Sequence, residues 1–379
     1  MITKNYVAAV AILISSIVGV GMFTLPYIAS KTGLFTLIGY FIVLGFFQHW
    51  FHTVYANVVL STKQQHRLPG YAEKYFGIKS KKYIFILSMF GGYGALLAYT
   101  IIGGEFLYHL VSPYLGGSLF QYTVGLLAFR ALIIYFGLAW VTRVEVILTG
   151  GLVGSLLIIA ALAGGQASIT NITFFNSSNI LLAYGPVLFA VGGALAINDI
   201  CMLLNKEKQR IVSALRVGII SAIAIMIFFT VIVTSISGSA TSPDALGGLG
   251  SFIDPLYYTI LLIIGLVTVT TSFFIVAESI QEMYIWDYRI NKHLAWLIVI
   301  LIPLVLYALG ARDVTKVIAL TGAISGGLLG SFYIFLGLRV KAKPEKKPPF
   351  KVSINPLVAY GVTILLLLGM TYQLWEIFG

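Results

Sequence analysis

The stretch Ser15-Ser16-Ile17-Val18-Gly19-Val20-Gly21-Met22-Phe23-Thr24-Leu25-Pro26 interrupts the first apolar segment of the chain. Gly19 and Gly21 each cost a helix interior roughly 1 kcal/mol relative to alanine, and Pro26 removes a backbone donor. Non-helical backbone at membrane depth is tolerated where it is buried in protein or lines a watery cavity. The stretch therefore predicts a broken spanning helix at a ligand site, although glycine and proline also cause ordinary kinks in membrane helices.

Composition indicates a polytopic membrane protein. Hydrophobic residues make up 59% and charged residues 10% of the 379 residues, and apolar runs of spanning length recur along the whole chain. No polar stretch is much longer than about 20 residues, which excludes a separate soluble domain. Cys201 is the single cysteine, so the chain has no intramolecular disulfide and no cysteine-rich metal or redox site.

The hydropathy pattern predicts an all-α protein with eleven transmembrane helices. The expected spans are residues 6–31, 34–60, 83–111, 119–140, 146–163, 180–204, 212–237, 255–285, 294–309, 315–338 and 356–378.

Basic residues fall in alternate loops, which predicts the orientation in the cell membrane. The loops on one side carry Lys63, Arg67, Lys74, Lys79, Lys81, Lys82, Arg143, Lys206, Lys208, Arg210, Arg289, Lys292 and the basic run at 339–351. The opposite loops, at 112–118, 164–179 and 238–254, have no lysine or arginine. We expect the basic side to be cytoplasmic, with the N-terminus inside and the C-terminus outside. The net charge of +11 is then a topology signal within a lipid bilayer, and no nucleic-acid partner is expected.

A second interruption lies in the sixth expected span, at residues 185–199, and it contains Gly192-Gly193. The first span runs from inside to outside and the sixth in the opposite direction. Interrupted helices that open two successive five-helix units of opposite orientation are what an inverted repeat predicts. The expected units are 1–163 and 180–338, with 355–379 as an accessory eleventh helix.

The run Gly19-Val20-Gly21-Met22-Phe23-Thr24-Leu25-Pro26 resembles the first-helix signature of the hydroxy and aromatic amino acid permeases, a family of the amino acid, polyamine and organocation superfamily. The basic first cytoplasmic loop with Leu68-Pro69-Gly70-Tyr71 and the Gly192-Gly193 pair are similar to that family as well. The resemblance implies the five-plus-five inverted repeat of the bacterial leucine transporter fold and secondary transport of an amino acid.

In the fold that this resemblance implies, backbone groups of the two broken helices bind the substrate. N–H groups at the first break would hold the carboxylate, and carbonyls near Ile17 and at the second break would hold the ammonium. The third span would bound the side-chain pocket, with Tyr99 closing on the carboxylate or merely packed. The substrate-binding residues so implied are Ile17, Gly19, Val20, Gly21, Tyr93, Tyr99, Phe189, Gly192 and Gly193.

The eighth span carries hydroxyls in otherwise apolar surroundings, and hydroxyls in lipid often only bond the carbonyl one turn back. The resemblance implies instead one Na⁺ between the first and eighth helices, with no other cofactor. Its implied ligands are Ser15, Val18, Thr268, Thr271 and Ser272, neutral oxygens of the kind a hard cation prefers. Proton-coupled relatives can place a fifth-helix lysine there, and residues 146–163 contain none.

Ionisable residues inside the expected spans are few. Glu105 and Arg130 lie at comparable depth, and we expect them to form a structural ion pair, with a proton-relay role for Glu105 as the alternative. Asp199, Glu278 and Glu282 lie toward the basic side. We expect them to be gate or interfacial charges partnered by basic loop residues.

A secondary amino acid transporter is therefore the leading functional hypothesis, with a neutral aromatic or hydroxy amino acid as the expected substrate and Na⁺ symport as the expected coupling. A proton-coupled permease and an exchanger remain alternatives within transport. An enzyme would need a convergent catalytic set at one depth, and a channel would need a repeated pore-lining ring; the chain offers neither pattern. The sequence leaves the oligomeric state open.

Overall fold

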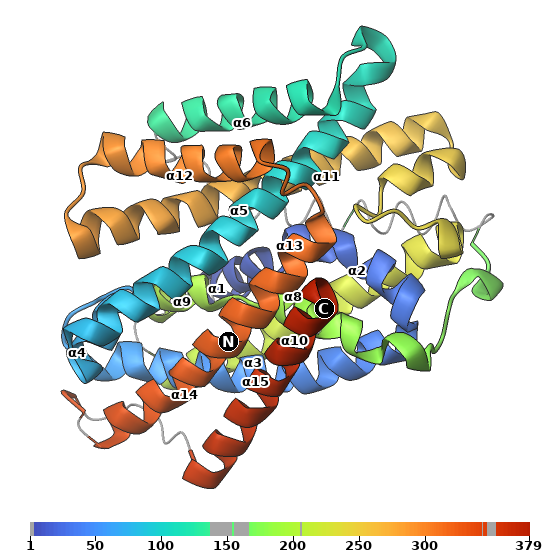
Figure 1. Ribbon diagram of the computed structural model, residues 1–379. Coiled ribbons are helices and arrows are strands. Elements are labelled where there is room, and N and C mark those ends of the chain that lie inside the picture. Colours follow the sequence, from blue (N-terminus) through green and yellow to red (C-terminus); the bar gives the residue numbers. More distant parts are fainter. Residues whose placement is uncertain (1–3, 137–153, 155–166, 205–206, 343, 347–353) are drawn as a thin grey trace.

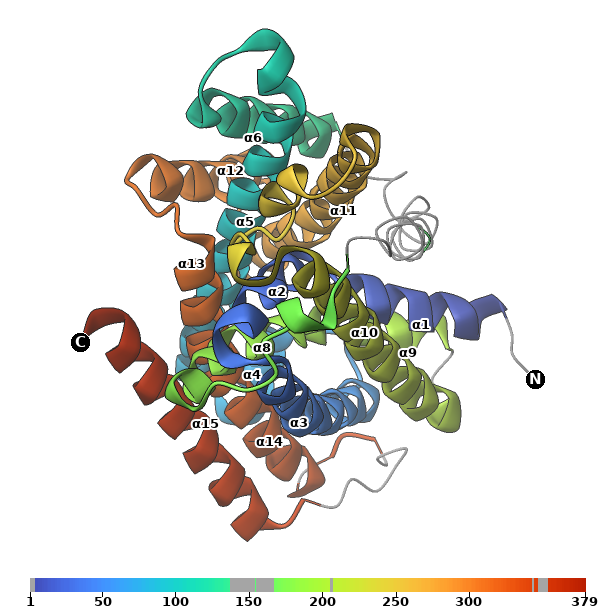
Figure 2. The ribbon, with the colours of Figure 1, turned by 90° about the vertical axis from the view of Figure 1, so that its right-hand side faces the viewer.

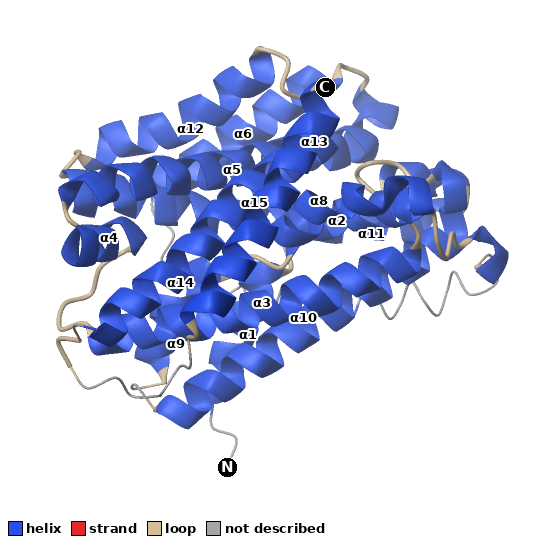
Figure 3. Cartoon of the chain, turned by 60° about the horizontal axis from the view of Figure 1, so that its bottom comes forward, coloured by secondary structure: helices blue, strands red, loops and turns tan. Residues whose placement is uncertain are grey.

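A computed structural model describes residues 4–136, 154, 167–204, 207–342, 344–346 and 354–379, and this part of the chain consists of helices and loops without a strand (Figures 1 and 3). Several helices exceed the length needed to cross a bilayer. The longest, α5 (Ile78–Leu115), has 38 residues and would extend about 57 Å at 1.5 Å per residue, against a hydrocarbon core of about 30 Å.

The first half of the chain begins with a pair of short helices, α1 (Lys4–Ile17) and α2 (Val20–Thr32). Next come the long helix α3 (Leu34–Ser61), the short amphipathic helix α4 (Leu68–Phe76) and the long helix α5. Helix α6 (Leu119–Phe136) then returns along α5. The fifth expected span, 146–163, lies almost wholly outside the described residues.

The second half opens with another interrupted segment. It consists of η3 (Ser177–Ala183), α8 (Tyr184–Ala190), η4 (Ala194–Ala196) and α9 (Ile197–Leu203), preceded by η2 (Ile169–Asn171). Continuous helices then follow: α10 (Lys208–Ser237), α11 (Pro255–Glu282) with its π-helical end η7 (Met283–Asp287), and α12 (Lys292–Ala308). The last elements are α13 (Val314–Thr321), the π-helical turn η8 (Gly322–Gly326), α14 (Gly327–Ala342) and α15 (Pro356–Phe378).

Eight helices in the described part of the chain are long and apolar enough to span a membrane, and the bent α1–α2 pair makes nine. Helix α12 is a further apolar helix of 17 residues. The expected bounds agree with the described helices to within a few residues, except that α5 extends further at both ends; the end of the fourth expected span, 137–140, lies outside the described residues. A total of eleven spans stays a prediction, as does the division into units 1–163, 180–338 and 355–379.

The interrupted helices lie at the centre of the bundle, and the continuous helices surround them (Figures 1 and 2). Helix α5 packs against α11, α4, α6 and α13, so it connects both halves of the chain. Helix α15 lies on the outside against α14 and reaches α8, where the Tyr184 hydroxyl donates to the Leu366 carbonyl at 2.8 Å. The buried Gln373 also accepts a hydrogen bond from the Gly185 N–H.

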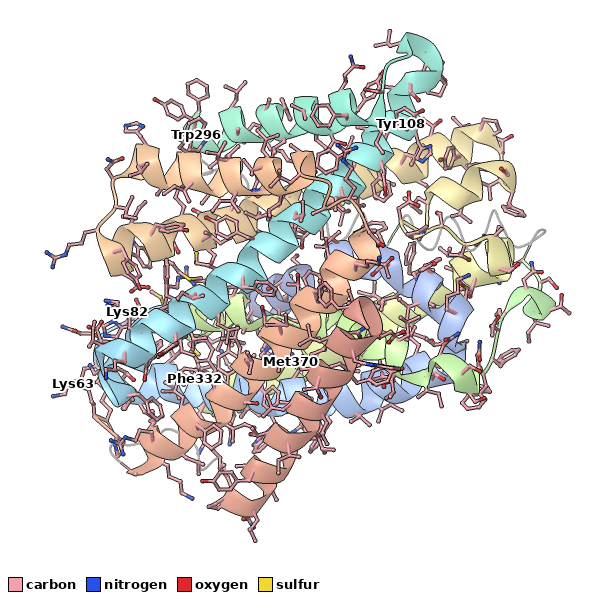
Figure 4. The ribbon with its side chains drawn as sticks, viewed as in Figure 1. Lys63, Lys82, Tyr108, Trp296, Phe332 and Met370 are labelled. Atoms are coloured by element: carbon pink, nitrogen blue, oxygen red, sulfur yellow. The ribbon has the colours of Figure 1, made fainter. Side chains whose placement is uncertain are left out.

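We call the end of the bundle that holds Lys63 and Lys82 the basic end, and the opposite end the Tyr108 end. Lys63 and Lys82 lie together at one end, near α4, and Tyr108 lies at the opposite end (Figure 4). At the Tyr108 end, the loop between α10 and α11 folds inward through η5 (Gly238–Ala240) and η6 (Gly247–Ser251). Its Ala245, Leu246 and Leu249 are buried, which closes this end with apolar side chains.

Candidate functional site

The first helix break lies between α1 and α2, whose axes are bent by 54°. Gly19 caps α2, and its N–H donates to the Ile17 carbonyl at 3.0 Å. Pro26 lies within α2 without ending it, so the break is made at Val18 and Gly19. In the first turn of α2 the Met22 N–H donates to the Gly19 carbonyl at 3.1 Å, while the N–H groups of Val20 and Gly21 precede the first intrahelical bonds and can hold an anion.

The second break separates α8 from α9. Helix α8 ends at Ala190, and after Val191 and two glycines the chain makes a 3₁₀ turn before α9 begins at Ile197. The Gly192 N–H donates to the Phe189 carbonyl at 3.1 Å. A carbonyl oxygen has two lone pairs, so this end of α8 retains acceptor capacity for a cationic group.

The two breaks are in direct contact with each other. A Cβ atom on Gly21 would lie 2.9 Å from the Ala190 Cα and 3.1 Å from the Phe189 Cδ1. A Cβ atom on Gly193 would lie 2.7 Å from the Ile17 Cγ1. The free N–H groups of one broken helix therefore lie beside the free carbonyls of the other.

A cavity of about 220 Å³ adjoins both breaks. Its walls come from α1, α2, α3, α5, the α8–α9 break, α11, η8 and α14. Its lining includes Gly19 and Gly21 at the first break, Phe189 and Gly193 at the second, Tyr99 of α5, and Arg67. Arg67 is the one charged side chain among the described residues that line it, so the breaks would bind a charged ligand through backbone groups.

Tyr99 places its hydroxyl directly at the first break. A Cβ atom on Gly19 would lie 2.2 Å from the Tyr99 hydroxyl oxygen. Gly19 has a φ of −128°, which any residue can adopt, so glycine is required here for the close approach of the tyrosine and not for backbone conformation. The hydroxyl and the first-turn N–H groups of α2 thus face the same space.

Aromatic rings close the cavity toward the Tyr108 end. The Phe23 ring packs edge-on against the rings of Phe106 and Phe229, with centroids 5.1 and 5.6 Å apart. All three side chains are buried. These rings fill the space between α2, α5 and α10 on this side of the first break.

Toward the basic end, the cavity reaches Arg67, which forms an ion pair with Glu282 at the end of α11. The Arg67 guanidinium also lies over the Trp286 ring, 5.6 Å from its centroid. Burial opposes the charge of Arg67, but the carboxylates of Glu282 and Asp199 outweigh it and raise the pKa of the guanidinium. The expectation that Glu282 pairs with a basic loop residue is confirmed.

Comparison with known proteins agrees with this geometry. The sequence matches the tryptophan/tyrosine permease family over residues 2–376. The chain belongs to the tryptophan/tyrosine permease family. No curated protein matches its sequence.

Solved structures of transporters share its fold. The crystal structure of MhsT in complex with L-phenylalanine is 13% identical with a TM-score of 0.72, and the match covers 99% of both chains. Mhp1, a nucleobase-cation-symport-1 family transporter, is 12% identical in its closed conformation with bromovinylhydantoin bound, with a TM-score of 0.68 over 97% of this chain and 90% of that one. Its inward-facing conformation gives a TM-score of 0.67 at 13% identity over the same shares. The permease is thus a transporter of the leucine transporter fold and not an enzyme.

Eight of the nine expected substrate-binding residues line the cavity of the permease, and Tyr93 does not. The Tyr93 hydroxyl instead donates to the Tyr284 hydroxyl of η7 at 3.0 Å. Six residues turn a helix through about 600°, so Tyr93 and Tyr99 project from α5 about 120° apart and only Tyr99 faces the cavity. Tyr93 thus faces η7 and not the cavity, and its expected contact with the substrate stays a prediction.

The expected cation ligands are divided between the cavity and the helix interior. Ser15 and Ser272 line the cavity from α1 and α11. The hydroxyl of Thr268 donates to the Ile264 carbonyl at 2.8 Å, and that of Thr271 donates to the Thr268 carbonyl at 3.0 Å. A hydroxyl that donates its proton in this way keeps its lone pairs for a cation, so the donor set suits Na⁺ chemically. Val18, whose carbonyl would contribute, is buried beside the break.

Arg130 and Glu105 do not form the expected ion pair. The Arg130 guanidinium, fully buried, donates to the Thr270 hydroxyl at 2.8 Å and to the Tyr99 carbonyl at 3.0 Å. It also lies 4.9 Å from the centroid of the Phe273 ring. Arg130 therefore ties α6 to α5 and α11, because a carbonyl of α5 and a hydroxyl of α11 lie within hydrogen-bond distance of its guanidinium.

The wall formed by η8 was not predicted from the sequence. Gly322 and Gly326 pack against α8, where Cβ atoms would lie 2.8 Å from the Phe189 Cβ and 2.7 Å from the Leu188 Cγ. Ser325 lies against Gly91 of α5. The spacing of Gly322, Ser325, Gly326 and Gly330 on one helical face was the available signal, since small residues at this spacing mark close helix contact in membranes.

Proposed function

We propose that this permease carries an aromatic amino acid across the cell membrane together with Na⁺ by alternating access. The observation that carries the proposal is the contact of two helix breaks of opposite polarity at one cavity. An amino acid bears a carboxylate and an ammonium on neighbouring atoms, and the N–H groups of α2 beside the carbonyls of α8 complement that pair. MhsT, which has a similar fold, binds L-phenylalanine.

The coupling ion is proposed from the donors of α1 and α11. Ser15 and Ser272 line the cavity on facing helices, and the hydroxyls of Thr268 and Thr271 keep free lone pairs. A neutral oxygen cage binds Na⁺ without requiring a carboxylate. With Na⁺ held there, α1 and α11 would be drawn together, which links ion binding to the first helix break.

The proposed orientation places the basic end in the cytoplasm, with the N-terminus inside. The cavity extends from the breaks to Arg67 at that end, and the Phe23, Phe106 and Phe229 rings close the other end. This arrangement supports an inward-facing state, in which the substrate leaves past the Arg67–Glu282 ion pair.

Proton coupling is the second candidate, and Glu105 favours it. Its carboxylate oxygen Oε2 is buried without a hydrogen-bond partner among the described residues. Asp244 and Asp313 are its charged neighbours, and both are acidic. A carboxyl group in such surroundings could carry a proton.

Uptake into proteoliposomes separates these candidates. The purified protein is reconstituted, and labelled tyrosine, tryptophan, phenylalanine, serine and threonine are supplied under an inward Na⁺ gradient at constant pH, with an equal K⁺ gradient as the control. Saturable uptake of aromatic amino acids that requires Na⁺ is the expected result. Uptake that is independent of Na⁺ but driven by a pH gradient would favour proton coupling through Glu105 over Na⁺ coupling. Uptake of none of these amino acids would overturn the proposed function.

The variant Thr271→Ala tests the cation ligands. We expect the Na⁺ concentration for half-maximal uptake to rise at least about tenfold, since the loss of one oxygen ligand from a small neutral cage costs more than a single hydrogen bond. Thr363→Ala is the matched control, because the Thr363 hydroxyl also donates to a carbonyl one turn back, that of Ala359 at 2.9 Å, but on α15. Equal Na⁺ dependence in both variants would remove Thr271 from the site.

A further inference from the structure

Three serine hydroxyls in the wall of the cavity have no hydrogen-bond partner among the described residues. They belong to Ser88 of α5, Ser279 of α11 and Ser325 of η8. Buried polar groups are normally paired, and an unpaired hydroxyl is costly unless a ligand or water satisfies it. These hydroxyls are therefore available to a bound molecule.

Other buried hydroxyls of the same helices bond their own backbone. Thr321, at the start of the η8 turn, donates to the Val317 carbonyl at 2.6 Å, and Ser331 of α14 donates to the Gly327 carbonyl at 2.8 Å. Ser325 lies between them in the chain, in the π-helical turn, and makes no such bond. Because π-helical turns shift the backbone register, they are frequent at functional sites.

Ser325 and Ile280, the residue that follows Ser279, pack against α5 at Gly91 and Gly92. A Cβ atom on Gly91 would lie 2.9 Å from the Ser325 hydroxyl oxygen, and one on Gly92 would lie 2.6 Å from the Cδ1 of Ile280, the neighbour of Ser279. Ser88 is one helical turn below Gly91 and Gly92. The absence of side chains at these two glycines lets η8 and α11 approach α5 closely, and Ser88, Ser279 and Ser325 all line the same cavity.

The level of Gly91 on α5 lies one substrate length from the helix breaks. Gly91 and Tyr99 are eight residues apart, or about 12 Å along α5, and the Tyr99 side chain leans toward Gly91 because helical side chains point to the N-terminus. Ala95 lies between them on the same face and also lines the cavity. An amino acid bound at the breaks would lay a ring over Ala95 and direct its far edge to the serines.

We propose that Ser88, Ser279 and Ser325 form a polar subsite that binds the ring hydroxyl of tyrosine or the indole N–H of tryptophan. A serine hydroxyl accepts and donates, so it can pair with either group. Phenylalanine would fill the same space but leave the hydroxyls unpaired, and sites of this kind reject the ligand that lacks the polar group. The subsite rests on the proposed function, since it presumes an amino acid at the breaks.

The test compares the KM values of labelled tyrosine, tryptophan and phenylalanine in proteoliposomes. The variants are Ser325→Ala, Ser88→Ala, Ser279→Ala and the triple variant, with Ser331→Ala as the control that removes a buried serine hydroxyl outside the cavity. We expect each single substitution in the subsite to raise the KM of tyrosine or tryptophan about five- to tenfold and to leave that of phenylalanine within about twofold. The triple variant should prefer phenylalanine, whereas Ser331→Ala should keep the wild-type order.

The outcomes separate the subsite from the proposed function. Wild-type uptake of all three amino acids, with the serine variants weakened equally for each, would overturn the subsite and leave the transport function intact. Wild-type preference for phenylalanine over tyrosine and tryptophan would overturn it as well. Uptake of none of the three by the wild-type protein would overturn the proposed function and the subsite with it.

Discussion

Both breaks interrupt a spanning helix, but different residues pack against them. At the α1–α2 break, a Cβ atom on Gly19 would lie 2.2 Å from the Tyr99 hydroxyl oxygen, and one on Gly21 would lie 2.9 Å from the Ala190 Cα. At the α8–α9 break, Gly193 faces the ends of flexible side chains, the Ile17 Cγ1 at 2.7 Å and the Leu13 Cδ1 at 3.1 Å. A backbone neighbour cannot yield and a buried aromatic ring can yield only by moving as a whole, whereas aliphatic side chains can rotate. The comparison indicates that the N–H side of the site is rigid and that the carbonyl side is adaptable at Gly193.

Gly21→Leu should impair transport more than the other substitutions, because it places a large side chain on the rigid N–H side of the site. Its Cβ would collide with the α8 backbone, and the rest of the side chain would fill the space beside the first-turn N–H groups of α2. We expect uptake and substrate binding to be abolished, measured as transport and as binding of the labelled amino acid to purified protein.

The matched control is Gly361→Leu on α15, where a Cβ would meet nothing within 4 Å. This variant should retain transport. A folded, monodisperse Gly21→Leu protein that binds substrate with wild-type affinity would contradict the assignment of the N–H groups to the site.

The sequence predicts where the two helix breaks lie but not which residues pack against them. Gly19, Gly21, Gly192 and Gly193 were identified from composition and spacing, because a helix break at membrane depth leaves a local signal. The residues that pack against the breaks leave no such local signal in the sequence. Whether Tyr93 or Tyr99 faces the cavity depends on the rotation of α5 about its axis, and the weakly amphipathic sequence of α5 does not determine that rotation. The partners of Arg130 were missed for a related reason, since residue counting gives depth in the membrane but not the direction of a side chain.

The second prediction concerns Gly19 and Tyr99 as a pair. Gly19→Ala should raise the KM at least about tenfold, because the Tyr99 ring must move away from the break to admit a methyl group. Tyr99→Phe removes the oxygen at 2.2 Å and leaves the Cζ at 3.2 Å as the nearest ring atom. The double variant should therefore lose less than the sum of the single variants, with a coupling free energy of about 1–3 kcal/mol. Additive losses would mean that the hydroxyl does not set the geometry of the first break.

Gly193→Ala should have the smallest effect, and it probes the adaptable side. The added methyl group meets only side-chain ends of Ile17 and Leu13, and we expect overpacking to cost about 1 kcal/mol of stability, a fall of about 2 °C in the apparent Tm in detergent. The KM should stay within about threefold, because the α8 carbonyls need not move when Ile17 changes rotamer.

Gly192→Ala is the informative partner, since its Cβ would lie 3.1 Å from the Phe189 carbonyl oxygen, an acceptor proposed for the ammonium. If Gly193→Ala impaired binding as strongly as Gly19→Ala, the carbonyl side would be as rigid as the N–H side, and the difference between the two breaks would lie in their polarity alone.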